Sequence, residues 1–100
     1  MIQLIGRSQL EPATIAHLDG IVNYTIITLK NGQQIVVSKT LKVMEARLSE
    51  YPNFLRVNKS VILNTDFAKR KDRIFVLPNK RKVTFSRRRW REFNLNQTNN

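Results

Sequence analysis

The sequence contains no cysteine and a single histidine, His17. Without thiols the chain can form no disulfide, no thiolate metal site and no cysteine nucleophile. One imidazole cannot build a histidine-rich metal site, and a lone histidine is more often a residue at the surface or at the edge of a core. We therefore expect neither a metal nor any other cofactor.

Glycine is also scarce, with three residues that are never neighbours. This excludes a glycine-rich loop that cradles a phosphate group. No motif places a carboxylate beside His17, so a Ser-His-Asp triad is not expected. Asp66 and Asp72 lie in turns among Lys and Arg, where they fit local charge partners better than an acid-base pair. The sequence therefore predicts a protein that is not an enzyme.

Long apolar runs are missing as well. The longest of them span about four residues, whereas a transmembrane helix needs about 20. The N-terminus has no apolar segment of the kind found in secretory signals. We expect a cytoplasmic protein that does not contact a membrane. A chain of 100 residues has the length of one small domain, so we expect a single domain over residues 1–100.

Acidic residues are few, with 7 Asp and Glu against 18 Lys and Arg, and the formal net charge is +11. Residues 1–50 hold 5 basic and 4 acidic side chains, whereas residues 51–100 hold 13 and 3. This asymmetry indicates a polyanionic partner, either nucleic acid or an anionic membrane surface. Membrane surfaces are best bound by longer basic amphipathic helices than this sequence predicts. Nucleic acid is therefore the expected partner.

Alternating and β-branched residues predict a mostly β protein. The clearest element is a hairpin over residues 23–38, in which Asn31-Gly32 fits a type I′ turn, because both central residues of that turn need positive φ. Turns are also expected at Asn64-Thr65-Asp66 and at Pro78-Asn79-Lys80. Further strands are expected at residues 1–5, 14–18, 54–57, 61–63, 67–71, 73–77 and 82–85.

The first of two predicted helices covers residues 40–49. Ser38 or Thr40 is its expected N-cap, because a hydroxyl group can accept a hydrogen bond from a free amide of the first turn. Apolar residues recur within it at helical spacing. Pro52 ends the helix.

The second predicted helix covers residues 87–95 and follows Ser86 as its N-cap. Trp90 and Phe93 form its apolar face, where a place in the core is favoured over stacking on bases. Residues 96–100 are polar and are predicted to form a frayed tail. The predicted fold class is therefore mostly β, with about eight to ten short strands and two short helices.

Four stretches resemble one protein family in the same order and at similar spacing. Residues 54–64 read Phe-Leu-Arg-Val-Asn-Lys-Ser-Val-Ile-Leu-Asn and resemble the signature segment of the LytTR DNA-binding domain, with Asn-Lys where His-Arg is usual. Asn23-Tyr24-Thr25, residues 37–42 and residues 83–88 resemble three further segments of the same family. The resemblance covers residues 14–94.

This resemblance implies an elongated stack of small β-sheets. It implies a bacterial transcription regulator, of the type that forms the effector domain of response regulators. Such domains insert loops and the ends of elements, rather than a recognition helix, into the major grooves of double-stranded promoter DNA. They commonly bind repeated half-sites, where two copies can form a dimer on the DNA. The chain holds no receiver domain, so it is either a stand-alone regulator or one domain of a longer protein.

The resemblance also implies which residues contact DNA. Tyr24, Lys59 and Arg88 match positions at which family members contact DNA, although Tyr24 also fits a half-buried strand aromatic and Lys59 a solvated charge. Arg88 is the best candidate for base readout, because a guanidinium group can bind O6 and N7 of guanine together. Phosphate or neighbouring base contacts are expected from Asn23, Lys39, Asn58, Arg87 and Arg89.

Other polar residues fit structural roles. Successive residues of a helix are turned by about 100°, so Arg87, Arg88 and Arg89 cannot all point the same way, and at least one of the three is expected to face solvent or to pack. Arg56 alternates with apolar residues in a predicted strand, and Asn64 lies in a predicted turn, so both are interpreted as structural. The clusters Lys69–Lys71 and Lys80–Lys82 could form a second electrostatic surface or contact flanking DNA, and the sequence leaves both open.

The alternative function is that of a small basic RNA-binding protein of the ribosomal type. Its size and charge would be similar. Readers of single strands use exposed aromatic side chains among cations. The five phenylalanines of this sequence occupy apolar positions of the predicted elements instead. This favours duplex DNA over RNA.

Overall fold

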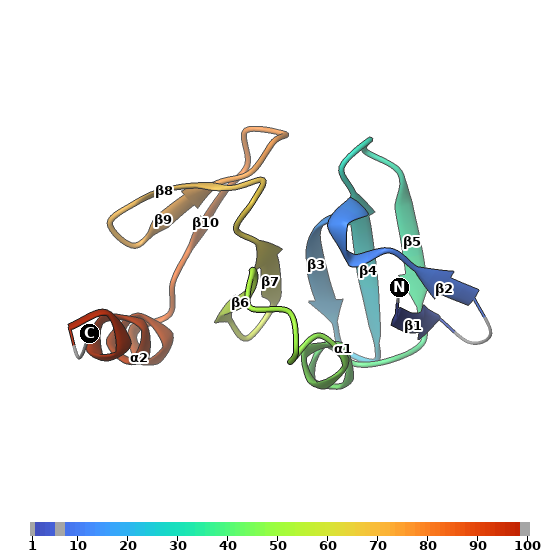
Figure 1. The fold of residues 1–100 in the computed structure, drawn as a ribbon, viewed down its shortest axis with the longest axis horizontal. Coiled ribbons are helices and arrows are strands. Elements are labelled where there is room, and N and C mark those ends of the chain that lie inside the picture. The colour runs from blue at the N-terminus through green and yellow to red at the C-terminus, as the bar shows by residue number, and fades with distance from the viewer. Residues whose placement is uncertain (1, 6–7, 99–100) are drawn as a thin grey trace.

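A computed structural model describes residues 2–5 and 8–98 of the chain. Within those residues it contains ten strands, two α-helices and a short 3-10 helix, arranged in an elongated molecule of 40 × 26 × 25 Å (Figure 1). This confirms the predicted mostly β, elongated fold. The strands are β1 (Ile2–Ile5), β2 (Ser8–Leu10), β3 (Ile15–Ile21), β4 (Tyr24–Leu29), β5 (Gln34–Val37), β6 (Phe54–Asn58), β7 (Val61–Asn64), β8 (Lys69–Lys71), β9 (Ile74–Val76) and β10 (Lys82–Thr84). The helices are η1 (Pro12–Thr14), α1 (Leu41–Arg47) and α2 (Arg87–Thr98).

The larger sheet has five antiparallel strands in the order β5-β4-β3-β7-β6. Helix α1 packs on one of its faces through Leu41, Met44 and Leu48, whose spacing places them on one side of the helix. Ile27 and Ile62 meet this helix from the sheet, and each apolar side chain buried in this way contributes about 1.5–3 kcal/mol. The result is the first of two hydrophobic cores.

The second core lies between the three-stranded sheet, ordered β10-β9-β8, and helix α2. Phe85 is its centre, with ring centroids 5.3 Å from Phe75, 5.4 Å from Trp90 and 5.1 Å from Phe93. Trp90 and Phe93 thus pack in the core, as expected, and do not form a platform for bases. Arg70 covers this aromatic cluster from outside, with its guanidinium carbon 5.0 Å from the centroid of Phe93.

Strand β7 belongs to both cores. Successive side chains of a strand point to opposite faces, so Ile62 packs with α1 while Val61 and Leu63 pack with the second core. One strand therefore joins the two halves of the molecule.

Several element boundaries differ from the prediction. The hairpin over 23–38 is present, but of its two turn residues only Gly32 has positive φ, at 91°, so the turn is not type I′. The amide of Gly32 donates to the carbonyl of Leu29 instead, at 2.9 Å, as in a three-residue loop that ends in a bulge. The positive φ falls on one residue because the loop is one residue longer than predicted.

The prediction of a frayed tail over 96–100 is wrong for residues 96–98, where α2 continues to Thr98. No glycine or proline follows Leu95 to end the helix. Residues 99–100 lie outside the described part of the chain. The strand expected over 67–71 begins only at Lys69, because the amide of Phe67 still closes the preceding turn by donating to the carbonyl of Asn64 at 3.0 Å.

Candidate nucleic-acid interface

Three segments meet along one edge of the molecule, the lower edge in Figure 1: the β3–β4 turn, the β6–β7 turn and the start of α2. Backbone hydrogen bonds connect them in pairs. The amide of Gly20 donates to the carbonyl of Ser60 at 2.8 Å, and the amide of Ser86 donates to the carbonyl of Val57 at 2.9 Å. These turns are therefore held at fixed positions relative to one another.

A groove of about 560 Å³ lies between the β6–β7 turn, strand β10 and the start of α2. Four residues expected from the sequence line it together: Asn58, Lys59, Arg88 and Arg89. Lys82 and Arg81 of the basic cluster 80–82 complete its positive lining. Their place in the groove was not predicted, although the clustering of charge marked them as candidates.

The β6–β7 turn is built so that Lys59 projects outward. The side-chain oxygen of Asn58 accepts from the amide of Ser60 at 2.8 Å, while its side-chain nitrogen donates to the carbonyl of Thr84 at 3.1 Å. Arg56 donates from Nε to the carbonyl of Asn58 at 3.1 Å and from Nη2 to the carbonyl of Lys59 at 2.8 Å. The backbone of the turn is thus hydrogen-bonded within the protein, and the Lys59 side chain is exposed.

The three arginines at the start of α2 point in different directions, as the helical geometry predicts. Arg88 is 73% exposed and lines the groove, with its Nε 3.9 Å from the carboxylate of Glu92. Arg89 is 23% exposed and packs toward α1. Arg87 lines a separate hollow beside Trp90. Arg88 and Arg89 therefore line the groove, whereas Arg87 lies outside it.

The remaining candidates lie outside this groove, at the β3–β4 turn and before α1. Tyr24 is 39% exposed at the first position of β4, where it pairs with Ile21, and Asn23 is exposed in the turn. Val22, at the tip, has a φ of 29° and is 88% exposed, a strained position that sequence reasoning missed. Lys39 is exposed, and its carbonyl accepts from the hydroxyl of Thr25 at 2.8 Å.

A polar cluster joins the two sheets behind the groove. Arg81 binds the carboxylate of Asp19 through both terminal nitrogens, at 2.8 and 3.0 Å, and this hydrogen bonding raises the pKa of Arg81. The Nε2 atom of His17 lies 3.6 Å from the same carboxylate. Burial lowers the pKa of His17 below 6.5, against the opposing effect of Asp19. Arg81 thus serves the protein's own structure although it lines the groove.

Neither a metal-ligand cluster nor a membrane-spanning helix is found among the described residues. No three of their His, Asp or Glu side chains gather so that they could hold a metal ion. Across residues 2–5 and 8–98, no helix has the length and apolar character needed to cross a membrane.

Comparisons with known proteins agree with this picture. None of the curated proteins matches the chain. Among solved structures, the chain is similar to the LytTr DNA-binding domain of a protein named as a methyl-accepting/DNA response regulator from Bacillus cereus. The two are 18% identical with a TM-score of 0.67, over 82% of this chain and 79% of that one. This likeness concerns the fold.

The family comparison is more direct. The LytTr DNA-binding domain matches residues 7–96, which is most of the chain. It confirms the fold and the DNA-binding function of a transcription regulator that the sequence predicted, and it gives no support to the RNA-binding alternative. The chain belongs to the LytTr DNA-binding domain family.

Proposed function

We propose that this edge of the molecule binds double-stranded promoter DNA in a sequence-specific manner, through turns and the start of α2 inserted into major grooves. The observation that carries the proposal is the groove that brings Lys59 and Arg88 together from elements far apart in the sequence. Both side chains are exposed. We propose that residues 1–100 form one DNA-binding domain of a bacterial regulator in the cytoplasm.

The contacts differ in what they can contribute. Arg88 is exposed at the first turn of a helix and can bind a guanine through two hydrogen bonds, which discriminates between bases by about 1–3 kcal/mol. Lys59 and Tyr24 are proposed as further contacts to the DNA. Asn58 uses both atoms of its side-chain amide inside the protein, which supports a role in shaping the turn. Phosphate contacts are proposed for Asn23, Lys39, Arg87 and Arg89.

We also propose that two copies bind repeated half-sites. The long axis of the molecule is 40 Å, comparable to one turn of B-DNA, which is about 34–36 Å long. One copy can therefore cover about one helical turn beside its neighbour, and contacts between the copies would give a dimer on the DNA.

Selection of binding sites from a random duplex library at about 150 mM salt tests this function. The expected result is an enriched motif, repeated at a spacing of about 10 base pairs. Competition with a structured RNA should leave the selected duplex bound. Retained binding without any enriched motif would contradict the proposal, since it would mean that the charge of the chain binds phosphate alone.

Arg88→Ala provides the test at a single residue. The variant is expected to lose discrimination at one or two base pairs of the motif, by about 1–3 kcal/mol, because one guanidinium reads one base. Binding to each single-base variant of the motif measures this. Equal weakening on all sequences would instead identify Arg88 as a phosphate contact.

A further inference from the structure

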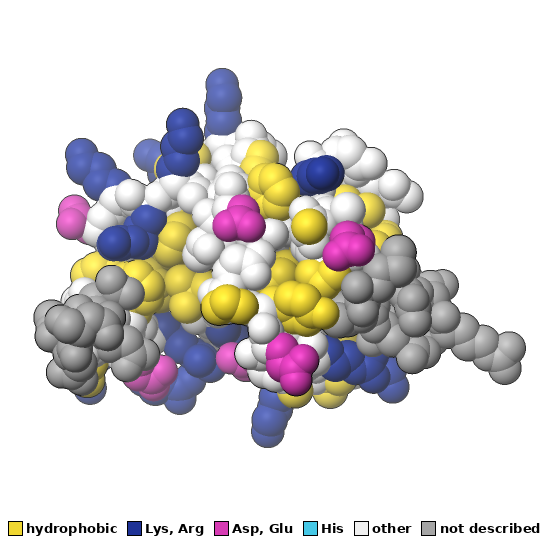
Figure 2. All heavy atoms as spheres, viewed as in Figure 1, with side chains coloured by type: hydrophobic (Ala, Val, Ile, Leu, Met, Phe, Trp, Pro, Cys, Tyr) yellow, Lys and Arg dark blue, Asp and Glu magenta, His cyan; other side chains and the backbone are white. Residues whose placement is uncertain are grey.

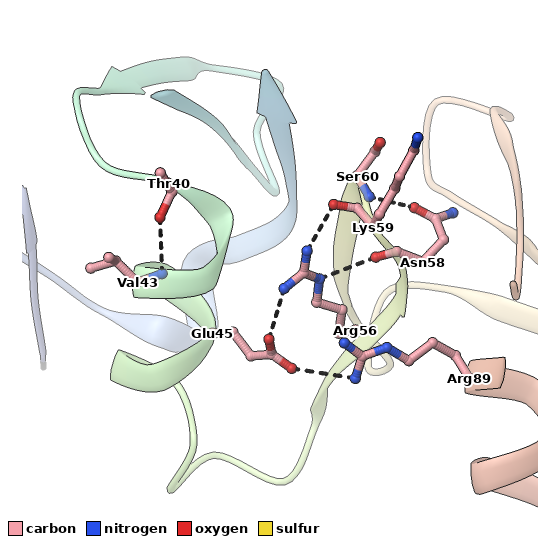
Figure 3. A network of polar contacts seen from close by, with 8 residues as sticks. All are labelled: Thr40, Val43, Glu45, Arg56, Asn58, Lys59, Ser60 and Arg89. Carbon is pink, nitrogen blue, oxygen red and sulfur yellow. Dashed lines mark hydrogen bonds and ion pairs between the residues drawn. The ribbon is translucent and has the colours of Figure 1, made fainter. Parts of the chain in front are cut away.

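Glu45 is a carboxylate at a DNA-binding edge that is otherwise rich in cations. It lies on α1, and its two oxygens take arginines from two other elements (Figure 3). Oε1 is 2.8 Å from Nη1 of Arg56 on β6, and Oε2 is 3.6 Å from Nη1 of Arg89 on α2. One side chain therefore connects α1 with two of the three segments that line the groove, through β6 and α2.

Through Arg56 this connection reaches the β6–β7 turn. The side chain of Arg56 is 14% exposed, and its guanidinium binds the carbonyls of Asn58 and Lys59 with the nitrogens that do not contact Glu45. A planar guanidinium fixes the direction of all its hydrogen bonds at once. Arg56 thus links the carboxylate of Glu45 to the backbone that carries Lys59.

Through Arg89 the connection reaches the start of α2. The amide of Arg89 donates to the hydroxyl of Ser86 at 3.3 Å, and its side chain reaches Glu45, whereas Arg88, one helical step of about 100° away, is 73% exposed. Residues of one helical turn rotate together. Holding Arg89 against Glu45 therefore sets the direction in which Arg88 leaves the helix.

We propose that Glu45 is a positioning residue for DNA recognition, which holds the Lys59 turn and the start of α2 in the relative position that sequence readout requires. This inference rests on the proposed function. If charge alone acted, removal of the Glu45 carboxylate would strengthen DNA binding, because a carboxylate near DNA repels phosphates. Positioning predicts the opposite effect on the recognition of sequence.

Glu45→Gln and a matched control, Glu50→Gln, separate the two effects. Glu50 is exposed shortly after α1, and both substitutions raise the net charge by one. Affinity is measured by fluorescence anisotropy on the selected site and on a shuffled duplex of equal length. Both variants should bind the shuffled duplex at least as tightly as the wild type. Only Glu45→Gln should lower the ratio of specific to non-specific affinity, by about tenfold, which is the contribution of one well-placed base contact.

Arg56→Lys tests the same connection without a change in net charge. A lysine cannot hold two carbonyls and a carboxylate in one plane, so the ratio should fall again. The double variant should lose less than the sum of the two single losses, because both act through one network. Thermal unfolding of each variant identifies any loss that comes from global stability, and Arg56→Lys carries the test if Glu45→Gln does not fold.

Equal ratios for Glu45→Gln, Glu50→Gln and the wild type would overturn the inference. A wild type that shows no preference between the selected and shuffled duplexes would contradict the proposed function instead. The two failures are therefore distinguishable in one experiment.

Discussion

His17, Asp19 and Arg81 form a polar junction in a region where two sheets meet. His17 is 3% exposed, and its Nδ1 atom is buried without a hydrogen-bond partner. A buried imidazole resists protonation, since the charged form would lose its hydration. The neighbouring Arg81 adds to this effect, whereas Asp19 opposes it. The balance favours neutral His17 in the folded protein.

The stability of the protein should therefore depend on pH through His17. Because the pKa of His17 is lower in the folded state than its ordinary value of 6.5, the unfolded chain takes up a proton first as the pH falls. The contribution of neutral His17 is complete above about pH 6.5 and is lost as the pH falls through the folded pKa. The loss is about 1.4 kcal/mol for each unit of difference between the two pKa values.

Urea unfolding at pH 7.5 and at pH 5 measures this loss in the wild type and in His17→Gln. The glutamine cannot titrate, so the difference in unfolding free energy between the two pH values should be smaller in the variant. A difference of equal size in both proteins would assign the pH dependence to carboxylates instead.

Asn64 has the structural role that its place in a predicted turn indicated. Asn64 is fully buried, and its side-chain nitrogen donates to the carbonyl of Ile15 at 2.9 Å. Turn chemistry predicted such a role because asparagine often bonds to nearby backbone. The polar junction around His17 could not be predicted, because Arg81, which binds the neighbouring Asp19, is more than sixty positions away in the chain. Local patterns carry no information about such a contact.

At the scale of elements, helix α2 both packs in the core and carries a proposed DNA contact, and different residues serve the two roles. Trp90 and Phe93 hold its inner side in the second core, while Arg88 projects from its first turn. Ser86 connects the two, since its amide binds β6 and its hydroxyl accepts from the amide of Arg89. The N-cap thus fixes where the helix begins relative to the groove.

Ser86→Ala should weaken both stability and sequence recognition. Loss of an N-cap hydroxyl costs about 0.5–2 kcal/mol of unfolding free energy, because one amide of the first turn loses its partner. Chemical unfolding measures this cost, and binding to the selected site measures the effect on Arg88. Ser86→Asn retains a capping oxygen and should restore both. A variant that binds like the wild type while losing stability would show that the cap does not orient Arg88.

Turns were harder to predict than the elements they join. Helix α1 begins after Thr40, whose hydroxyl accepts from the amide of Val43 at 3.4 Å, as its cap chemistry predicted. The Asn31-Gly32 turn has a different type, because a single residue of loop length changes which backbone angles close the hairpin. Composition identifies a turn, whereas its geometry depends on the register of the paired strands.

At the scale of the whole molecule, the basic clusters divide by residue type. Arg70 covers the aromatic core and Arg81 binds Asp19, so the central arginine of each cluster serves the fold. The lysines beside them are exposed. In β8, alternate residues face opposite sides, which separates Arg70 from Lys69 and Lys71. In the second cluster Lys80 and Arg81 precede β10, and only Lys82 lies in the strand. In Figure 2, Lys and Arg side chains project from the upper edge, over the sheet of β8 to β10. The sequence could not predict this division, which depends on the register of three short strands.

That register distinguishes two lysines on one sheet face. Lys82, on β10, pairs with Val76 of β9 and lines the groove. Lys71, on β8, pairs with Ile74 of β9 and lies two strands away from β10. Neighbouring strands are about 4.8 Å apart, so Lys71 starts roughly 10 Å farther from the groove. Only Lys82 should therefore contact a phosphate of DNA bound there.

The dependence of affinity on salt tests this difference in a matched pair. Lys82→Gln and Lys71→Gln each remove one charge from the same face of the sheet. On a duplex trimmed to one half-site, Lys82→Gln should reduce the slope of log K against log salt by about 0.9, the effect of one lost phosphate contact. Lys71→Gln should leave the slope unchanged, because its ammonium group does not reach the duplex. Equal reductions for both would mean that DNA covers the whole outer face of the three-stranded sheet, and unchanged slopes for both would place the DNA away from β10.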